Sequence, residues 1–284
     1  MGFFRKLWPK DNLADKAAFT FTHVGLILMC LFELFVVLPI YHDNFSTMFY
    51  VHFGAGLFIL VQIFSNMYKS IFTDSTVNST KFNLPSVLMP DWRYCSICQV
   101  NTPLRSHHCK LCDVCVIKRD HHCIFTGKCI GFLNHRYFFW MASYLWIGCF
   151  YTISFNKEYY LDVLGGFRWS LIFQFFCPML AWLFGYANGQ QLMILLIGGV
   201  NMMAMFLFSC LMSFQIFFIS RGQTQFECKK KIRDYNRGLF ENWKLVLGKK
   251  WYLTWLCYCI PSALPGTGTD FKKLDQSDIG LKRL

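Results

Sequence analysis

Two long apolar runs near the start of the chain set the strongest limit on how it folds. The first covers roughly residues 17–41 and the second roughly residues 47–67. Each exceeds the ~20 residues that a helix needs to cross the hydrocarbon core of a bilayer. Three further apolar stretches follow at about 137–155, 169–187 and 190–219. We therefore expect an all-α polytopic membrane protein.

The composition supports an integral membrane protein. Of the 284 residues, 55% are apolar and 19% aromatic, whereas only 15% are charged. Such a chain is too apolar for an ordinary soluble domain. Its formal charge of +12 is spread over the polar segments and does not form one basic patch. We therefore expect membrane lipids and an acidic cofactor such as coenzyme A as partners, and no nucleic acid.

The distribution of basic residues predicts about four transmembrane helices among the five hydrophobic segments. Thirteen Lys or Arg follow from Arg221 onward, against two, Lys157 and Arg168, between residues 156 and 190. Cytosolic segments carry the excess of basic residues, so the C-terminal tail should be cytosolic and the number of spans even. The N-terminal tail, with Arg5, Lys6, Lys10 and Lys16, should face the same side. The 169–187 stretch is then expected to be re-entrant, interfacial or fused to an oblique neighbour.

These signals divide the chain into five parts. They are a cytosolic N-terminal tail (1–16), a transmembrane hairpin (17–67), a cytosolic cysteine-rich domain (68–136, core 93–139), C-terminal transmembrane helices (137–219) and a cytosolic tail (220–284).

Half of the fourteen cysteines cluster between residues 95 and 129, beside histidines at ligand spacing. Disulfide scaffolds are small, secreted and loop-rich, whereas Cys-x2-Cys pairs near histidines are typical of zinc sites. The cluster is therefore expected in a reducing, cytosolic environment with two structural zinc ions. Spacing alone allows several pairings of its ligands, which are Cys95, Cys98, His108, Cys109, Cys112, Cys115, His122 and Cys129.

One cysteine is left over, in the tetrad Asp120-His121-His122-Cys123. Thiolate is the attacking form of cysteine, and its formation needs a neighbouring base or cation. Adjacent histidines on an extended backbone point apart, so His122 can bind zinc while His121 faces Cys123. Asp120 can then orient His121 through its other ring nitrogen. The alternative is that Cys123 is a spare zinc ligand or an inert thiol.

In this order and spacing, the segment from Cys95 to Phe138 resembles the cysteine-rich domain of the DHHC protein S-acyltransferases, or palmitoyltransferases. The resemblance implies one zinc site of Cys95, Cys98, His108 and Cys115 and another of Cys109, Cys112, His122 and Cys129. It implies that Cys123 accepts a long-chain acyl group from an acyl-coenzyme A such as palmitoyl-coenzyme A. The acyl group then passes from the Cys123 thioester to a cysteine of a substrate protein.

Two weaker motifs extend the resemblance past the last span. Thr224-Gln225-Phe226-Glu227 is similar to the family's Thr-Thr-x-Glu motif, and Tyr235 to Gly248 is similar to its aromatic-Gly-Asn motif. The second Thr is here Gln225, which departs from the family at the position that helps to hold the tetrad Asp, here Asp120.

The candidates for contact with coenzyme A are Arg105, Lys128 and Phe125. Ile124-Phe125 replaces a frequent Pro-Trp pair after the nucleophile, so an aromatic side chain is kept at the expected acyl entrance. Lys128 faces either a phosphate or solvent.

The sequence favours one class of function over two others. The favoured class is a protein S-palmitoyltransferase of the endomembrane system, in the endoplasmic reticulum or Golgi, with a cytosolic active site. The alternative is a zinc-stabilised membrane adaptor of weak or no catalysis, because Gln225 slackens the triad. A zinc hydrolase or nucleic-acid-binding zinc finger is disfavoured, since the chain has no His-Glu-x-x-His and no basic recognition helix.

Overall fold

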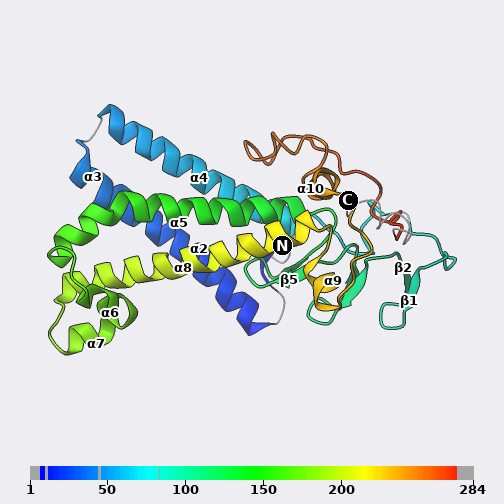
Figure 1. Cartoon of the computed structure of the whole chain (residues 1–284), viewed down its shortest axis with the longest axis horizontal. Helices are drawn as coiled ribbons and strands as arrows, with labels where there is room; N and C mark the ends of the chain where they lie inside the picture. The colour runs from blue at the N-terminus through cyan, green and yellow to red at the C-terminus, as the bar shows by residue number, and fades with distance from the viewer. Residues whose placement is uncertain (1–6, 10–11, 44–45, 83, 274–284) are drawn as a thin grey trace. The chain divides into compact units, whose positions relative to one another are not determined.

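The structure is a computed structural model that describes residues 7–9, 12–43, 46–82 and 84–273. Arg5, Lys6 and Lys10 of the expected N-terminal tail lie outside the described residues, as does the last part of the expected C-terminal tail. The elements of the described residues are shown in Figure 1.

Four helices of the described chain are long and apolar enough to cross a membrane, which confirms the expected number of spans. Helix α2 (Leu13–Phe32) continues through a π-helical turn, η1 (Glu33–Val37), into α3 (Leu38–Tyr41). The other three spans are α4 (Thr47–Phe72), α5 (His135–Leu164) and α8 (Gly189–Ser220). Large apolar side chains on them, such as Phe35 and Phe206, are exposed in the isolated chain, as expected for helices that face lipid.

The fifth hydrophobic stretch forms two short helices, α6 (Ser170–Phe176) and α7 (Pro178–Leu183), which follow α5 and precede α8 in the chain (Figure 1). Pro178 occupies the first turn of α7, where its missing N–H group is tolerated, and it breaks the chain into two helices. At 7 and 6 residues, neither helix reaches the length of a span.

The all-α expectation is wrong for the cysteine-rich segment, which forms three antiparallel hairpins. They pair β1 (Arg93–Cys95) with β2 (Val100–Thr102), β3 (His107–Cys109) with β4 (Val114–Val116), and β5 (His121–Cys123) with β6 (Lys128–Ile130). Each turn contains a residue of positive φ, namely Gln99, Asp113 and Gly127. A Cys-x2-Cys ligand pair needs a tight turn, and such a turn cannot lie inside a helix.

The described chain divides into two compact units. One comprises residues 1–22, 64–141 and 213–284 and contains the three hairpins, α9 (Gln225–Lys229) and α10 (Leu239–Leu247). Its core includes Phe82, Ile117, Phe132 and Leu245. The other comprises residues 23–63 and 142–212 and is helical, with a core that includes Val37, Leu164 and Leu195.

Candidate metal centres and active site

Two groups of four side chains in the hairpin unit could each hold a metal ion. They are Cys95, Cys98, His108 and Cys115 in one group and Cys109, Cys112, His122 and Cys129 in the other, and within each the ligand atoms all lie within 4.8 Å of one another. The structure thus brings together the eight residues expected to be zinc ligands, in the division that the family resemblance implies.

The distances within each group fit a tetrahedral zinc ion. Zn–S bonds of about 2.3 Å and Zn–N bonds of about 2.0 Å would separate sulfur from nitrogen by about 3.5 Å. His108 Nδ1 lies 4.0 Å from Cys95 Sγ and 3.3 Å from Cys98 Sγ. His122 Nδ1 lies 3.8, 3.3 and 3.8 Å from the sulfur atoms of Cys109, Cys112 and Cys129. Three thiols and one imidazole form a closed ligand set, typical of a structural site.

The two groups are successive copies of one arrangement, repeated every 14 residues. Each group takes a Cys-x2-Cys pair from one hairpin and a His–Cys pair from the next. In the first group the cross-strand pair is His108 and Cys115, and in the second it is His122 and Cys129. The positive-φ residues Gln99, Asp113 and Gly127 follow the same interval. The same 14-residue period is present in the sequence itself, as a recurring Cys-x2-Cys pair followed by a His and a Cys.

Cys123 occupies the position of the first Cys of a third pair, because Cys95, Cys109 and Cys123 are spaced by 14 residues. The second position of that pair is Thr126, and the described residues after it form no further hairpin that could supply a His and a Cys. The backbone N–H of Thr126 hydrogen-bonds the Cys123 thiol, and the Thr126 hydroxyl donates to the Cys123 carbonyl oxygen at 3.4 Å. The same kind of turn that presents candidate metal ligands in the first two hairpins thus presents a thiol outside both metal groups here.

The tetrad side chains form the expected chain of contacts. His121 Nδ1 donates to Asp120 Oδ2 at 2.7 Å, and the imidazole also hydrogen-bonds the Cys123 thiol. The His121 ring packs edge-on against Phe138, which is 1% exposed, with ring centroids 4.6 Å apart. Cys123, His121 and Asp120 are therefore arranged as a nucleophile, a base and a residue that orients the base.

The electrostatics favour a thiolate paired with an imidazolium. Burial opposes charge on His121, but the hydrogen bonds to Asp120 and Cys123 outweigh it and raise its pKa to about 9. Burial likewise opposes the Cys123 thiolate, but the hydrogen bond from His121 lowers the pKa of this thiol below its ordinary value. For Asp120, burial is outweighed by the nearby imidazoles of His135 and His121, so its pKa is lowered and it stays ionised.

The replacement of a Thr by Gln225 does not remove the hydrogen bond to Asp120. The backbone N–H of Gln225, at the first turn of α9, donates to Asp120 Oδ1 at 2.8 Å. Helix α9 is held by a capping box, in which Thr224 Oγ1 accepts from Glu227 N and Glu227 Oε2 accepts from Thr224 N. Phe226 stacks on His107, with ring centroids 3.8 Å apart. The orientation of Asp120 therefore depends on the backbone of α9 and not on the side chain at position 225.

Two further side chains that sequence reasoning missed reach the tetrad. Gln215 Nε2 approaches Asp120 Oδ2 at 3.4 Å, and Gln215 Oε1 accepts from His135 Nε2 at 2.9 Å. Gln215 and His135 are 2% and 1% exposed. Their only sequence signal is that they are polar residues within apolar spans, where an unpartnered polar side chain is costly.

Arg105, a candidate for contact with coenzyme A, lies in a buried ion pair instead. Its Nε and Nη2 donate to the two carboxylate oxygens of Glu227 at 2.6 and 2.7 Å, and Nη2 also donates to the carbonyl oxygen of Gly222. The guanidinium lies over the rings of Tyr235 and Phe271. With 4% of its surface exposed, Arg105 joins the hairpins to the C-terminal segment.

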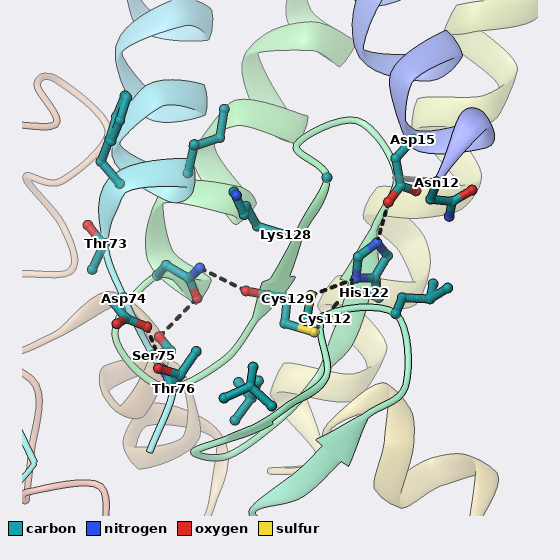
Figure 2. A pocket seen from close by; sticks show the side chains of 17 residues that line it. Asn12, Asp15, Thr73, Asp74, Ser75, Thr76, Cys112, His122, Lys128 and Cys129 are labelled. Carbon is teal, nitrogen blue, oxygen red and sulfur yellow. Dashed lines mark hydrogen bonds and ion pairs between the residues drawn. The ribbon is translucent and has the colours of Figure 1, made fainter. Parts of the chain in front are cut away.

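The other two candidates lie near the tetrad on the third hairpin. Lys128 lines a pocket of about 270 Å³ together with Asp15 and His122, as Figure 2 shows. Phe125 is half-buried in the turn between β5 and β6. Contact of Lys128 and of Phe125 with coenzyme A stays a prediction.

Comparison with known proteins agrees with this geometry. The family model described as DHHC palmitoyltransferase matches residues 89–232. The chain is 34% identical over 223 residues to Probable palmitoyltransferase ZDHHC24 of Danio rerio, covering 78% of this chain and 75% of that protein. It is 29% identical to Putative ZDHHC-type palmitoyltransferase 4 of Dictyostelium discoideum, covering 87% and 73% of the two chains. It is 30% identical to Probable palmitoyltransferase ZDHHC24 of Homo sapiens, covering 66% of each chain.

This chain belongs to the DHHC palmitoyltransferase family. As a DHHC palmitoyltransferase it is a multi-pass membrane enzyme with protein S-palmitoyltransferase activity. The matched region includes both candidate metal groups, the tetrad and the four residues from Thr224 to Glu227.

Proposed function

We propose that Cys123 is the acyl-accepting nucleophile of a membrane-bound protein S-palmitoyltransferase, with His121 as base and Asp120 as the residue that orients His121. The observation that carries this proposal is the hydrogen-bonded series from Asp120 through His121 to a cysteine that neither metal group uses. The lowered pKa of the Cys123 thiol supports its role as a thiolate at neutral pH.

In the first step the Cys123 thiolate attacks the thioester carbonyl carbon of a long-chain acyl-coenzyme A. The tetrahedral intermediate collapses, the bond to coenzyme A sulfur breaks, and the His121 imidazolium protonates the departing thiolate. In the second step His121 accepts the proton of a substrate cysteine, whose sulfur attacks the Cys123 thioester. Cys123 then leaves as a thiolate, so the enzyme returns to its starting state.

The two metal groups are proposed to hold structural zinc. Closed sets of three thiolates and one imidazole leave no position for substrate, so zinc would supply cross-links that fold the hairpins. His122 and Cys129 of the second group flank the turn that carries Cys123, and the tetrad strand β5 is thereby held in register with β6.

The helical unit contains a cavity that suits a fatty chain. Its volume is about 210 Å³, and its walls come from all four spans and are mainly apolar, with Leu26, Leu34, Leu57 and Leu145 among them. A palmitoyl chain gains about 0.8 kcal/mol for each CH2 group that it buries, so such a cavity can supply much of the affinity for the donor. Palmitoyl-coenzyme A is therefore the proposed donor, and Phe125 and Lys128 are retained as candidates for contact with it.

The proposed acceptors are cysteine-containing proteins at the cytosolic membrane surface, and the proposed compartment is the endoplasmic reticulum or Golgi. Support for a cytosolic active site comes from the even number of candidate spans and from the basic residues after Arg221.

The test is labelling of detergent-purified protein with an alkyne-tagged palmitoyl-coenzyme A. We expect hydroxylamine-sensitive labelling of the wild type and none of Cys123→Ser, with zinc content and melting temperature unchanged. Cys112→Ser is not a suitable control because it removes a metal ligand, so Cys228→Ser, a half-buried cysteine outside both groups, serves instead. Equal labelling of wild type and Cys123→Ser would sink the proposal.

The alternative is an adaptor that binds zinc but does not transfer acyl groups. The argument for an adaptor was that Gln225 cannot hold Asp120 as a Thr side chain would. The backbone N–H of Gln225 donates a hydrogen bond to Asp120, which counts against that argument. Wild-type protein that holds zinc but is not labelled by the tagged palmitoyl-coenzyme A would favour the adaptor.

A further inference from the structure

The two zinc-binding histidines differ in what their second ring nitrogen meets. In the first group, His108 Nε2 lies 3.6 Å from Asp113, a carboxylate on its own hairpin that is 79% exposed. In the second group, His122 Nε2 donates to Asp15 Oδ2 at 2.8 Å, and the Asp15 side chain is 3% exposed. Figure 2 shows Asp15 at the start of α2 pointing toward His122. Only the second histidine of the two therefore has a hydrogen bond to a buried carboxylate.

The 14-residue repeat explains why the carboxylate comes from another part of the chain. The position in the third hairpin that corresponds to Asp113 is Gly127, which has no side chain to offer. Pro9 packs there so closely that a Cβ on Gly127 would lie 2.6 Å from Pro9 Cβ. The missing side chain thus admits the N-terminal segment, which carries Asp15 to His122.

A general helix-end effect does not account for this placement. Acidic residues in the first turn of a helix stabilise it through the helix dipole, and they do so while exposed to solvent. Asp15 is instead buried, and its Oδ1 has no hydrogen-bond partner among the described residues. Burial of a carboxylate is costly unless a strong donor compensates it, and the N–H group of a metal-bound imidazole is such a donor.

We propose that Asp15 is a positioning residue for the second zinc site, fixing the His122 ring through Nε2 so that Nδ1 faces the three thiols. This carboxylate holds the zinc in that site and ties the N-terminal end of α2 to strand β5. Since His122 lies between His121 and Cys123 on β5, the same contact also steadies the strand that carries the tetrad. The inference rests on the proposed zinc ions and not on the transfer chemistry.

The test compares zinc release from detergent-purified, full-length Asp15→Asn and Asp113→Asn with that from the wild type. Release into a colorimetric chelator is followed over time, and cobalt-substituted proteins are compared by visible absorption. Loss of such a carboxylate typically weakens metal binding by about 10- to 100-fold. We expect one of the two ions to leave Asp15→Asn faster by about that factor, with altered cobalt bands, and both ions to leave Asp113→Asn at the wild-type rate.

Asp113→Asn is a matched control, because it makes the same chemical change beside the other histidine and Asn tolerates the positive φ of this position. Release from Asp15→Asn at the wild-type rate would overturn the role of Asp15, as would equal acceleration in both variants. Wild-type protein without zinc would overturn the zinc site itself, and with it the inference.

A second pair of variants tests whether Asp15 acts through His122. His122→Cys retains a four-ligand site but has no N–H group to donate to Asp15. If Asp15 acts through His122, the double variant D15N/H122C should release zinc at the same rate as H122C. A further acceleration in the double variant would contradict the proposal.

Discussion

At the scale of single residues, the proposed nucleophile stands where a third candidate metal-ligand pair would begin, and that pair is incomplete. Cys123 keeps the tight turn and the backbone N–H···S hydrogen bond of a Cys-x2-Cys pair, but Thr126 stands in place of the second cysteine. Such a turn stabilises a thiolate whether or not a metal is present, because its N–H groups point at the sulfur. The addition of His121 and Asp120 converts that thiolate into a candidate nucleophile.

The pH dependence of acylation should report the thiolate–imidazolium pair. The initial rate of Cys123 labelling should rise as pH increases through the lowered pKa of this thiol. It should fall as pH increases through about 9, where His121 loses the proton that the departing coenzyme A thiolate takes. Asp120 raises the pKa of His121, so Asp120→Asn should shift the upper limb to lower pH. An upper limb that does not move in Asp120→Asn would argue against this pair.

The hydrogen bond from Gln225 to Asp120 can be removed without a change in side-chain charge. Gln225 is the first residue of α9, where Pro is well tolerated, and Thr224 before it already has the extended backbone that Pro requires. Gln225→Pro therefore deletes the N–H group and should slow acylation about tenfold, since hydrogen bonds to charged groups contribute about 1.5–3 kcal/mol. Gln225→Ala keeps the N–H group and should label at the wild-type rate. Equal rates for the two variants would show that the bond does not matter.

At the scale of elements, the sequence predicted where the long helices lie along the chain, but it did not predict the hairpins of the cysteine-rich segment. The lengths of the apolar runs located five candidate segments, because a bilayer demands about 20 apolar residues per helix, and the distribution of basic residues reduced the expected number of spans to about four. The hairpins were missed because each strand has only three residues, too few for a period to be recognised. The eight candidate metal ligands were found from residue type and spacing, whereas Asp15, Gln215 and His135 were missed because only the fold brings distant segments to the tetrad.

The ion pair between Arg105 and Glu227 should hold α9 against the hairpins. Glu227→Gln keeps the capping box, since Gln also serves at this position, but leaves the buried Arg105 without its counter-charge. Loss of one partner of a buried pair costs about 3–5 kcal/mol, so we expect Tm to fall by about 10 °C in a thermal-shift measurement.

Glu241→Gln is the matched control for this change. It breaks the ion pair between Glu241 and Lys244, whose side chains are 54% and 37% exposed respectively. Such surface ion pairs contribute little to stability. We expect its Tm to stay within about 2 °C of the wild type. Similar Tm values for Glu227→Gln and Glu241→Gln would show that the buried pair does not anchor α9.

At the scale of the whole molecule, the count of spans decides which parts of the chain share a side of the membrane. Four spans return the C-terminal tail to the side of the N-terminal tail and of the cysteine-rich segment between α4 and α5. A fifth span at 169–187 would separate the tail from that segment. The hydrogen bond from Gln225 to Asp120 and the ion pair of Arg105 with Glu227 require both on one side, which agrees with the even count.

A glycosylation-acceptor scan should show this topology directly. An Asn-x-Ser acceptor inserted with flanking Gly-Ser residues between Gly165 and Gly166, which lie between α5 and α6, should be glycosylated in microsomes because it is expected in the lumen. The same acceptor at Lys249-Lys250, after α10, should stay unmodified, because the basic C-terminal region is retained on the cytosolic side. Modification at both positions would mean that residues 169–187 cross the membrane as a fifth span. The cysteine-rich segment and the C-terminal motifs would then lie on opposite sides and could not meet.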